Sequence, residues 1–467
     1  MFKLKREYNM KKILKIMTMI AIILFLHEST EITGARFENY QINTKIMQSS
    51  DYNIFDYMNC TISGNIVTIK EPVKIDGNRF DNKFCNFIFP KNYIFKVSDD
   101  FRIGENVFEF YNFDNLSISN LNINGKLRRS GENFYNDDIL LNTSNDWNNL
   151  NQAIWIRDSK NVNLNNVNSI NSTGCGICIK RVDEVSVINC SVRNSYQHGI
   201  FVGNVRKKVL ISNCNCTAFG DLDYETNIKI GGIGILVSES ENPIISNCII
   251  NGFEDTGTKT EGCNHVRYIN NTIKNFGKDG IKVQGYGDKV VNINDCIVKG
   301  NIVDTRFNGR KDGSSYILFH EVSNGIIEDN TILKSVKNNT MCDDGIRVNM
   351  LNGTQASNIK IINNIVNTGT NSPSLNIIGN NESSVNNIIV SGNTFGTHII
   401  CDKVNEININ NNTLDCLTLE ENKYMIYLLN SSVVEVLKNK FVGISSNDYA
   451  IYVQKDSCES LIIDNVN

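Results

Sequence analysis

The sequence predicts an all-β solenoid, in which short strands wind into coils that stack on one another. A motif with a period of about 23 residues recurs through most of the chain, which is typical of repeat architectures. Its apolar residues alternate with polar ones at the period of two that β-strands show. Of the 467 residues, 74 are Asn, 32 are Gly and only 4 are Pro, while 41% are hydrophobic. This hydrophobic share excludes a wholly disordered chain, and the few prolines exclude a collagen-like one.

The first 35 residues have the features of an export signal. They carry six Lys and Arg, all before an apolar run at 16–26. A run of this length is too short for a bilayer core of about 30 Å, but it suits the core of a signal peptide. A retained anchoring helix is the alternative. In both cases we expect the body of the protein to be secreted or at the cell surface, with no stable transmembrane span.

The charge of the remaining chain bears on its partners. It carries 40 Lys and Arg against 47 Asp and Glu. Sequence-independent binding to nucleic acid needs a basic face that displaces counterions from the phosphates. The acidic balance therefore argues against nucleic acid as a partner.

Each repeat contains a polar residue that we call the anchor. Two apolar residues spaced by two precede it, and another apolar residue follows three positions later. We expect the anchors to occupy the same turn of every coil, because Asn tolerates the left-handed backbone of sharp turns and stacked Asn side chains bond to each other. The template fits at Asn120, Asn166, Asn189, Asn213, Asn247, Asn270, Asp295, Asp329, Asn363, Gly392 and Asn411, and more loosely at Lys438 and Asn465.

A second element follows most anchors, an apolar alternation that Gly usually opens. Alternation of β-branched residues at this spacing predicts strands, and no stretch after the export signal shows the helical period. A repeat of this size buries its apolar residues only by stacking on its neighbours. The Gly-opened strands are expected at 176–179, 199–202, 234–237, 280–283 and 345–348, with variants at 153–156 and 316–319.

The chain has 14 cysteines, which in an exported protein usually form disulfides. Cys190, Cys214, Cys248 and Cys296 each follow an anchor, so they occupy a repeat position. We therefore expect them to be small buried side chains stacked in register. Occasional disulfides between adjacent coils remain the alternative.

Residues 161–172, rich in Asn and leading to Gly176 and Ile177, resemble proteins of the pectate-lyase-like superfamily. The resemblance covers 111–467 and implies a right-handed, single-stranded parallel β-helix of about 12–14 coils. Residues 36–110 contain shorter alternations and are expected to form an N-terminal cap and the first coils. In this superfamily an extended polysaccharide lies in a trough on one side of the helix. The resemblance therefore implies a polysaccharide partner, and an acidic one is a particular candidate.

Large insertions predict which side carries the trough. They fall between the anchor and the Gly-opened strand, at 126–150, 218–232, 253–265, 304–315 and 334–344. Loops inserted at one angular position of a solenoid form a wall and commonly carry binding function. The Gly-opened strands are therefore expected to form the floor.

Alternation predicts which residues of this floor face outward. If the apolar residues of 280–283 face the core, Lys282 faces out, and the same reasoning exposes His320 and Arg347 on the next two coils. Asp279 and Asp344 stand just before their strands, two coils and roughly 10 Å apart. These five residues are the predicted catalytic group. The predicted substrate-binding residues, also facing outward, are Trp155, Arg157 and Lys180.

Two chemistries fit this predicted group. In a lyase or epimerase, a Lys or Arg abstracts the proton next to a uronate carboxylate, and Ca²⁺ held by Asp343 and Asp344 neutralises that carboxylate. In a glycoside hydrolase, two carboxyl groups flank the bond, and a separation of about 6.5–9.5 Å favours inversion. The alternative to an enzyme is a surface protein or adhesin, in which the outward charges are merely solvated.

His198 is a further catalytic candidate. Residues 197–203 (Gln-His-Gly-Ile-Phe-Val-Gly) resemble the histidine motif of the polygalacturonase family, glycoside hydrolase family 28. That family also has aspartates on preceding coils and a basic pair on a later strand. Here Gly174 and Cys175 open the preceding strand without a carboxylate, and 228–230 (Ile-Lys-Ile) matches the basic pair poorly. The motif therefore lacks the acid and base of a hydrolase.

Overall fold

The computed structural model describes residues 54–466 apart from 81–82, 103, 131–132, 137–138, 141–149, 219–231, 286–292, 306–313, 335–343, 351–353, 355, 369–371, 381–384, 416–423, 444–449 and 455–460. The predicted export signal lies outside these residues. Contacts divide the chain into the units Met1–Ser49 and Ser50–Asn467, and the described residues belong to the second. Over this part of the chain, no helix is apolar and long enough to cross a membrane.

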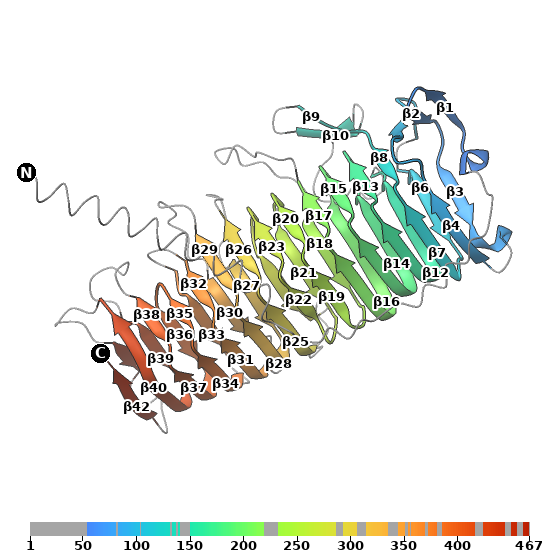
Figure 1. The fold of residues 1–467 in the computed structure, drawn as a ribbon. Coiled ribbons are helices and arrows are strands. Elements are labelled where there is room, and N and C mark those ends of the chain that lie inside the picture. The colour runs from blue at the N-terminus through green and yellow to red at the C-terminus, as the bar shows by residue number, and fades with distance from the viewer. Residues whose placement is uncertain are drawn as a thin grey trace, which may run out of the picture. The chain divides into compact units, whose positions relative to one another are not determined.

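The second unit is a solenoid in which parallel strands form three stacks (Figure 1). Each coil contributes one strand to each stack, and consecutive coils pair in parallel, so the predicted fold class is confirmed. Within the described residues the first stack holds fourteen strands, in agreement with the predicted 12–14 coils. It contains β3 (Val73–Asp76), β6 (Phe108–Tyr111), β12 (Ile154–Asn165), β14 (Ile177–Ile188), β16 (His198–Ser212), β18 (Ile233–Ser238), β21 (Thr256–Glu261), β24 (Ile281–Gln284), β27 (Ser315–His320), β30 (Asp344–Asn349), β33 (Leu375–Ile378), β36 (Ile399–Asp402), β39 (Ile426–Leu429) and β41 (Ile451–Val453).

The second and third stacks complete each coil. β12, β14 and β16 run through both the first and the second stack. The second stack continues with β4 (Phe84–Ile88), β7 (Asn115–Ser119), β19 (Pro243–Ser246), β22 (Arg267–Ile269), β25 (Ile293–Lys299), β28 (Val322–Glu328), β31 (Ser357–Ile362), β34 (Val385–Ser391), β37 (Val404–Asn410), β40 (Ser432–Val442) and β42 (Leu461–Val466). The third stack contains β2 (Ile66–Ile69), β5 (Ile94–Val97), β8 (Asn122–Asn124), β13 (Asn168–Ile170), β15 (Ser191–Arg193), β17 (Asn215–Thr217), β20 (Ile249–Asn251), β23 (Thr272–Lys274), β26 (Ile302–Thr305), β29 (Thr331–Lys334), β32 (Ile365–Asn367), β35 (Thr394–Phe395), β38 (Thr413–Asp415) and the end of β40.

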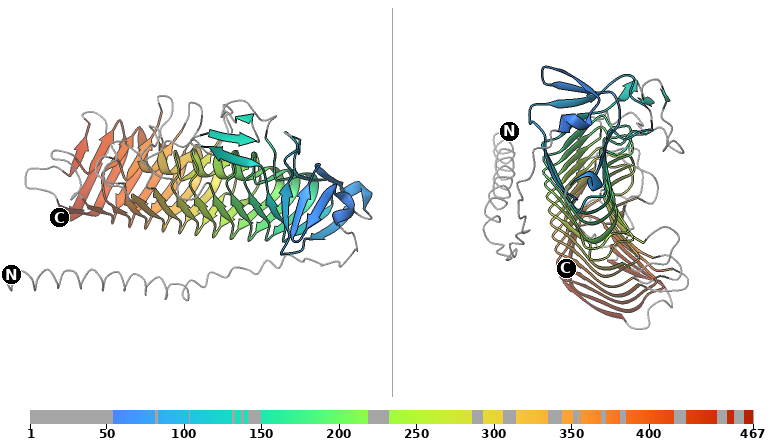
Figure 2. Two further views of the ribbon diagram at one scale, coloured as in Figure 1. Left: turned by 90° about the horizontal axis from the view of Figure 1, so that it is seen from above. Right: turned by 90° about the vertical axis from the view of Figure 1, so that its right-hand side faces the viewer.

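A few elements lie outside the stacks. β1 (Cys60–Ser63) pairs antiparallel with β2, and a small separate sheet contains β9 (Leu127–Ser130), β10 (Asn133–Asn136) and β11 (Ile139–Leu140). The helical turns are η1 (Ile54–Tyr57) and η2 (Gly77–Arg79). The three stacks enclose the interior of the solenoid (Figure 2). Inward residues of successive coils, such as Ile281 and Ile317, are fully buried there and form the core.

The anchors form one corner of the solenoid, between the second and third stacks, and they adopt the left-handed conformation. Asn189, Asn270 and Asp329 have φ values of 54°, 55° and 55°. The anchors Asp295 and Asn465 are wrong. Asn465 lies one position after the corner, because its Oδ1 accepts from the backbone and side-chain nitrogens of Asn439 (3.0 and 2.9 Å), as ladder residues do. For Asp295 the register between strands shows the error. Ile269 pairs with Lys299, so Gly300, with φ of 67°, lies opposite Asn270. Asp295 lies instead near the start of the long strand β25, where an Asn-Asp-Cys sequence imitates the repeat template.

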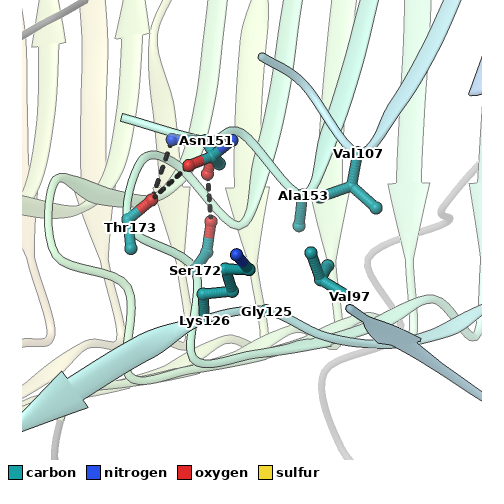
Figure 3. Close-up of a pocket in the computed structure, with 8 residues that line it drawn as sticks. All are labelled: Val97, Val107, Gly125, Lys126, Asn151, Ala153, Ser172 and Thr173. Carbon is teal, nitrogen blue, oxygen red and sulfur yellow. Dashed lines mark hydrogen bonds between the residues drawn. The ribbon is translucent and has the colours of Figure 1, made fainter. Parts of the chain in front are cut away.

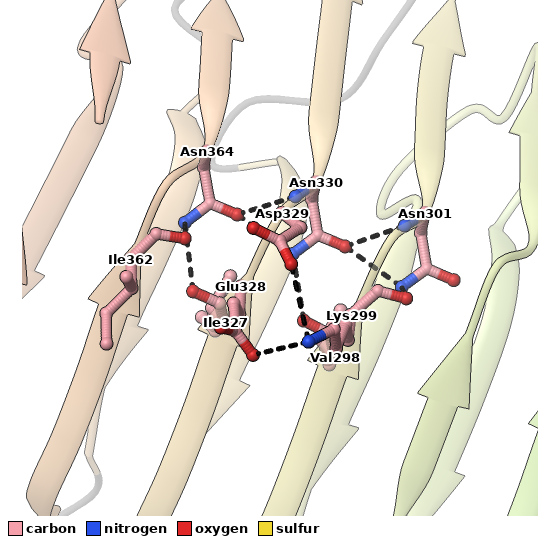
Figure 4. Close-up of polar contacts among 9 residues, drawn as sticks. All are labelled: Val298, Lys299, Asn301, Ile327, Glu328, Asp329, Asn330, Ile362 and Asn364. Atoms are coloured by element: carbon pink, nitrogen blue, oxygen red, sulfur yellow. Dashed lines mark hydrogen bonds and ion pairs between the residues drawn. The ribbon is translucent and has the colours of Figure 1, made fainter. Parts of the chain in front are cut away.

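A ladder of buried asparagines runs through the interior one position after the anchors. Among the anchors themselves, Asn166 donates to Asn120 Oδ1 at 2.9 Å, as predicted, but this bond is exposed. Asn330 donates from its side chain to Asn364 Oδ1 (2.9 Å), and its Oδ1 accepts from the backbone and side-chain nitrogens of Asn301 (both 2.9 Å) (Figure 4). These amides are almost fully buried, so the ladder satisfies polar groups that water does not reach. It contains Asn271, Asn301, Asn330, Asn364, Asn393, Asn412, Asn439 and Asn465.

Cysteines occupy the ladder position on earlier coils. Cys190, Cys214 and Cys248 are each about 1% exposed, and the Cys248 backbone N–H donates to Asn271 Oδ1 at 2.9 Å. Their thiols donate to main-chain carbonyls as the ladder amides do, for example from Cys214 Sγ to Val187 O at 3.4 Å. The predicted stacking is therefore confirmed for these three residues. Cys296 is buried as predicted, but it does not stack with these three residues, because Asn301 holds the ladder position on that coil. The cysteines of the described residues are free thiols.

The glycines that open the first-stack strands are required by close packing between coils. A Cβ atom on Gly280 would lie 2.5 Å from the carbonyl oxygen of Tyr316 on the next coil and 2.5 Å from Cγ1 of Val303. Real Cβ atoms do not approach backbone so closely, so any side chain would push the coils apart. Gly234 and Gly345 face the next coil in the same way.

Candidate functional site

The outward side chains of the first stack form two parallel files. The register between successive strands places them in line, at about 4.8 Å per coil. The file of Lys282 contains Trp155, Cys178, Phe201, Leu236, Lys259, Lys282, Leu318, Arg347, Asn376, Ile400, Tyr427 and Tyr452. The file of His320 contains Arg157, Lys180, Gly203, Ser238, Glu261, Gln284, His320, Asn349, Ile378, Asp402 and Leu429.

The five predicted catalytic residues come together on β24, β27 and β30. Lys282 and Arg347 lie two coils apart in one file, about 10 Å at the stacking distance, and His320 lies on the coil between them in the other file. Asp279 lies just before β24, and Asp344 is the first residue of β30. The two occupy equivalent positions, because Ser315 on the coil between them pairs with Asp344 and donates its backbone N–H to Asp279 Oδ1 at 2.9 Å. We call these five residues the charged centre.

Each carboxylate of the charged centre is paired with the cation of its own strand. Asp279 Oδ2 lies 3.5 Å from Lys282 Nζ, and Asp344 Oδ2 accepts from Arg347 Nε and, at 3.0 Å, from Asn376 Nδ2. The sequences Asp-Gly-Ile-Lys-Val and Asp-Gly-Ile-Arg-Val build the same arrangement twice. Both aspartates are almost completely buried, at 1% and 3% exposed, whereas the two cations are partly exposed. A ligand on the outer face can therefore contact Lys282 and Arg347, whereas Asp279 and Asp344 lie beneath these two side chains.

Burial alters the acid–base properties of the centre. Desolvation lowers the pKa of Lys282, the neighbouring Lys259 and Lys278 lower it further, and Asp279 opposes the shift. Burial, together with Lys282 and Arg347, lowers the pKa of His320 to about 4. His320 Nε2 is buried and has no hydrogen-bond partner among the described residues, and the same holds for Asn349 Oδ1 and Asn376 Oδ1. The centre thus contains a neutral imidazole and polar atoms with unused hydrogen-bonding capacity.

The neutral state of His320 predicts a loss of stability in acid. Because the folded pKa, about 4, lies below the unfolded value of about 6.5, the unfolded chain binds more protons between these pH values. Stability due to neutral His320 is therefore present above pH 6.5 and is lost as the pH falls towards 4. We expect the free energy of unfolding to fall less steeply over this range in a His320→Gln variant than in the wild type, as measured by chemical denaturation. Equal pH dependence of the two proteins would contradict the assignment.

The predicted calcium site does not fit the described residues. Asp343 lies outside them, and Asp344 is already bonded to Arg347 and Asn376. A cation beside Arg347 would be repelled, and the described chain contains no group of three His, Cys, Asp or Glu side chains that could hold a metal ion. The chemistry proposed below therefore uses only groups of the protein itself.

The three predicted substrate-binding residues lie together at the N-terminal end of the two files. Lys180 Nζ lies 5.7 Å from the centre of the Trp155 ring and 4.8 Å from that of Phe201. Arg157 lies over the ring of Tyr111 at 4.7 Å and bonds to Glu109 at 2.9 Å. Cations held over aromatic faces gain electrostatic energy. We call Trp155, Lys180 and Phe201 the tryptophan platform.

His198 lies beside this platform, not in the charged centre. It opens β16, three coils before β24. Its Nδ1 accepts the backbone N–H of Ile233 at 3.2 Å, and its ring packs on Phe201 with centroids 6.0 Å apart. Burial and the charges of Lys259 and Lys180 lower its pKa to about 4. His198 thus connects two coils through a hydrogen bond. Among the described residues, no Asp or Glu side chain bonds to it.

The sequence did not predict one strand of the site, β21. Residues 253–265 were expected to be an insertion, but they contain β21, a full member of the first stack between β18 and β24. The error arose because Thr258 and Thr260 replace the usual apolar residues in the core, where the Thr258 hydroxyl donates to Ile235 O at 3.1 Å. The signal was Gly257, which opens the strand. β21 contributes Lys259, directly beside Lys282, and its partner Glu261 at 2.8 Å.

The other four insertions lie mostly outside the described residues, so the predicted wall of the trough stays a prediction.

A small cavity near the first coils is lined by Lys126, Asn151 and Thr173, among others (Figure 3). Its volume of about 210 Å³, which includes space open to solvent, is below the roughly 300–1,000 Å³ of ligand pockets. Lys126 Nζ donates there to the carbonyls of Asp99 and Phe101 at 2.7 and 3.1 Å, which ties the first coils together.

A model of the family described as "Right handed beta helix region" matches residues 152–310, which include Asp279 and Lys282 of the charged centre but end before its other three residues. The chain folds as a right-handed parallel β-helix. No curated protein matches it in sequence. Proteins with this fold have many different activities, so the fold alone does not show which activity this chain has.

Solved structures with a similar fold differ in function. The N-terminal fragment of bacteriophage Phi29 gene product 12 is 10% identical with a TM-score of 0.49, covering 82% of this chain and 66% of that one, so the chain spans slightly less than two thirds of the fragment. A mutant of the periplasmic alginate epimerase AlgG is 11% identical, with a TM-score of 0.41 and coverages of 82% and 79%. The surface adhesin PfbA of Streptococcus pneumoniae is 14% identical, with a TM-score of 0.40 and coverages of 83% and 84%. Likenesses at this level assign no activity.

Proposed function

We propose that the protein is exported and binds an acidic polysaccharide along the outer face of the first stack. We further propose that it acts on this polysaccharide as a lyase or epimerase, abstracting the proton next to a sugar carboxylate. The observation that carries the proposal is the charged centre, in which a partly buried amine of lowered pKa, Lys282, lies in line with Arg347 and beside His320. Partial burial raises the fraction of neutral amine at a given pH, as a general base requires.

The proposed chemistry assigns a role to each member of the centre. Arg347 binds the carboxylate of the sugar, and neutral Lys282 takes the proton from the adjacent carbon, C5. In elimination, the C–H electron pair forms the C4–C5 double bond, the bond from C4 to the bridging oxygen breaks, and that oxygen takes a proton from solvent. In epimerisation, a proton returns to the opposite face of C5. Asp279 and Asp344 position the two cations, and neutral His320 offers a hydrogen bond to the sugar.

Hydrolysis is less well supported than proton abstraction. A glycoside hydrolase needs carboxyl groups that reach the glycosidic bond, one of them as an acid. Asp279 and Asp344 are buried beneath Lys282 and Arg347 and are bonded to them. Neither is placed to contact a polysaccharide directly.

An assay against a panel of uronate-containing glycans tests the proposal. Purified protein is incubated with polygalacturonate, alginate and glycosaminoglycans, with and without added Ca²⁺. Unsaturated ends are measured by ultraviolet absorbance, reducing ends by a colorimetric assay and epimers by NMR. We expect unsaturated products or epimers with at least one glycan. Reducing ends without unsaturation would instead indicate a hydrolase.

The alternative is a non-catalytic adhesin, favoured by the internal pairing of every carboxylate in the centre. A protein that binds a glycan but alters none of the panel would support it. In that case replacing Lys282, Asp344 or Arg347 by Ala leaves glycan binding nearly unchanged, because these residues then take no part in binding.

A further inference from the structure

We infer that three tyrosines at the C-terminal end of the first stack form a second glycan-binding platform, on the opposite side of the charged centre from the tryptophan platform. The inference rests on the proposed function and extends it. The residues are Tyr424, Tyr427 and Tyr452, which we call the tyrosine platform. None of them stood out in the sequence, because their equivalence depends on the register of the last coils.

The geometry of the tyrosine platform suits stacking against a ligand. Tyr427 and Tyr452 are consecutive members of the Lys282 file, with ring centroids 6.0 Å apart, and Tyr424 packs against both, at 5.6 and 5.0 Å. The backbone N–H of Tyr424 donates to the Tyr427 hydroxyl at 3.1 Å, which fixes the orientation of that ring. Tyr452 is 37% exposed. Rings held in place by their neighbours bind with little loss of conformational entropy.

The position of the tyrosine platform relative to the charged centre indicates what kind of ligand it binds. From Lys282, the register runs through Lys259 and Leu236 to Phe201, three coils away. From Arg347 it runs through Asn376 and Ile400 to Tyr427, also three coils away. At about 4.8 Å per coil, an aromatic platform lies about 14 Å beyond each cation, and the two platforms are about 38 Å apart. The file is continuous, so a ligand that lies on the charged centre and extends in both directions meets both platforms.

An extended polysaccharide has the required chemistry. Its sugar rings present C–H faces that pack on aromatic rings, and a carboxylate of an acidic glycan pairs with Arg347 between the platforms. The occupant is therefore a long acidic glycan, bound internally, and not a chain end. A second copy of this chain is the competing occupant of exposed tyrosines.

The experiment compares long and short glycans. Size-fractionated oligosaccharides of polygalacturonate, alginate and the glycosaminoglycans are titrated by calorimetry into the wild type and the Tyr427→Ala and Tyr452→Ala variants. We expect each variant to bind the longest fractions about threefold to tenfold more weakly, and to bind short fractions as the wild type does. Tyr452→Phe keeps the ring and is expected to bind normally. Phe84→Ala, which removes an exposed ring from the second stack, is the matched control.

The possible results separate the two proposals. If the wild type binds long fractions and both Ala variants, folded by circular dichroism, bind them equally well, the platform is overturned and the proposed function stands. If the wild type binds no fraction of any glycan of the panel, the proposed function fails and the platform fails with it. If light scattering shows a wild-type dimer that the Ala variants lose, the tyrosines bind a second copy and the platform is likewise overturned.

Discussion

Replacing Asn330 by Ala is expected to lower the free energy of unfolding by about 3–5 kcal/mol, one of the largest effects of any single substitution in the solenoid. The side chain makes four hydrogen bonds in the buried ladder, two to Asn301, one to Asn364 and one to the carbonyl of Val298. Its loss leaves the backbone N–H of Asn301 without its acceptor and the Val298 carbonyl without its side-chain donor, in an interior that water does not reach. Each buried unpaired group costs about 1–3 kcal/mol.

Chemical denaturation of the variant and of a matched control measures this loss. The control is Asn161→Ala, which removes an exposed amide that bonds to Asn115 at 2.8 Å on the surface of the second stack. A surface substitution of this kind is expected to change stability by less than about 0.5 kcal/mol. Similar losses in the two variants would show that the buried ladder contributes no more than surface amides.

Replacing Lys282 by Met is expected to lower turnover on the responsive glycan by about 10²–10⁴-fold, the usual contribution of a general base. Met has nearly the same length but carries no amine. Lys282→Arg keeps the positive charge, yet a guanidinium stays protonated at all relevant pH values, so turnover is expected to fall while binding persists. Lys274→Met, an exposed lysine of the third stack, is the matched control and is expected to act as the wild type.

The pH dependence of turnover provides a second measurement of the same role. Asp279 raises the pKa of Lys282 against the larger lowering by desolvation. In Asp279→Asn that opposition disappears, so the pKa of Lys282 falls and neutral amine forms at lower pH. The acidic limb of the pH–rate profile is therefore expected to move to lower pH. An unmoved limb, or a Lys282→Arg variant with wild-type turnover, would contradict the role of Lys282 as base.

The sequence predicted much of the fold because a repeating unit repeats its physical requirements. Left-handed corners favour Asn, close-packed coils require Gly as at Gly280, and strands alternate apolar and polar residues. The same alternation placed Lys282, His320 and Arg347 on the outer face of successive coils. Where a coil departed from the usual residues, the prediction failed. β21 was missed because buried Thr258 and Thr260 replace Ile or Val, and Asp295 was misassigned because a second corner also selects residues that tolerate positive φ.

The sequence by itself determined the kind of solenoid and the residues that face outward, because both depend on local periodicity. Only the tertiary structure decided the register between coils. Register depends on how many residues each loop contributes before the chain returns to the stack, and no local pattern contains that number. Register is what places Asn376 beside Asp344, aligns Tyr427 with Tyr452 and places Asn330 between Asn301 and Asn364. Contacts between residues on different coils, and the chemistry that follows from them, exist only once the coils are stacked.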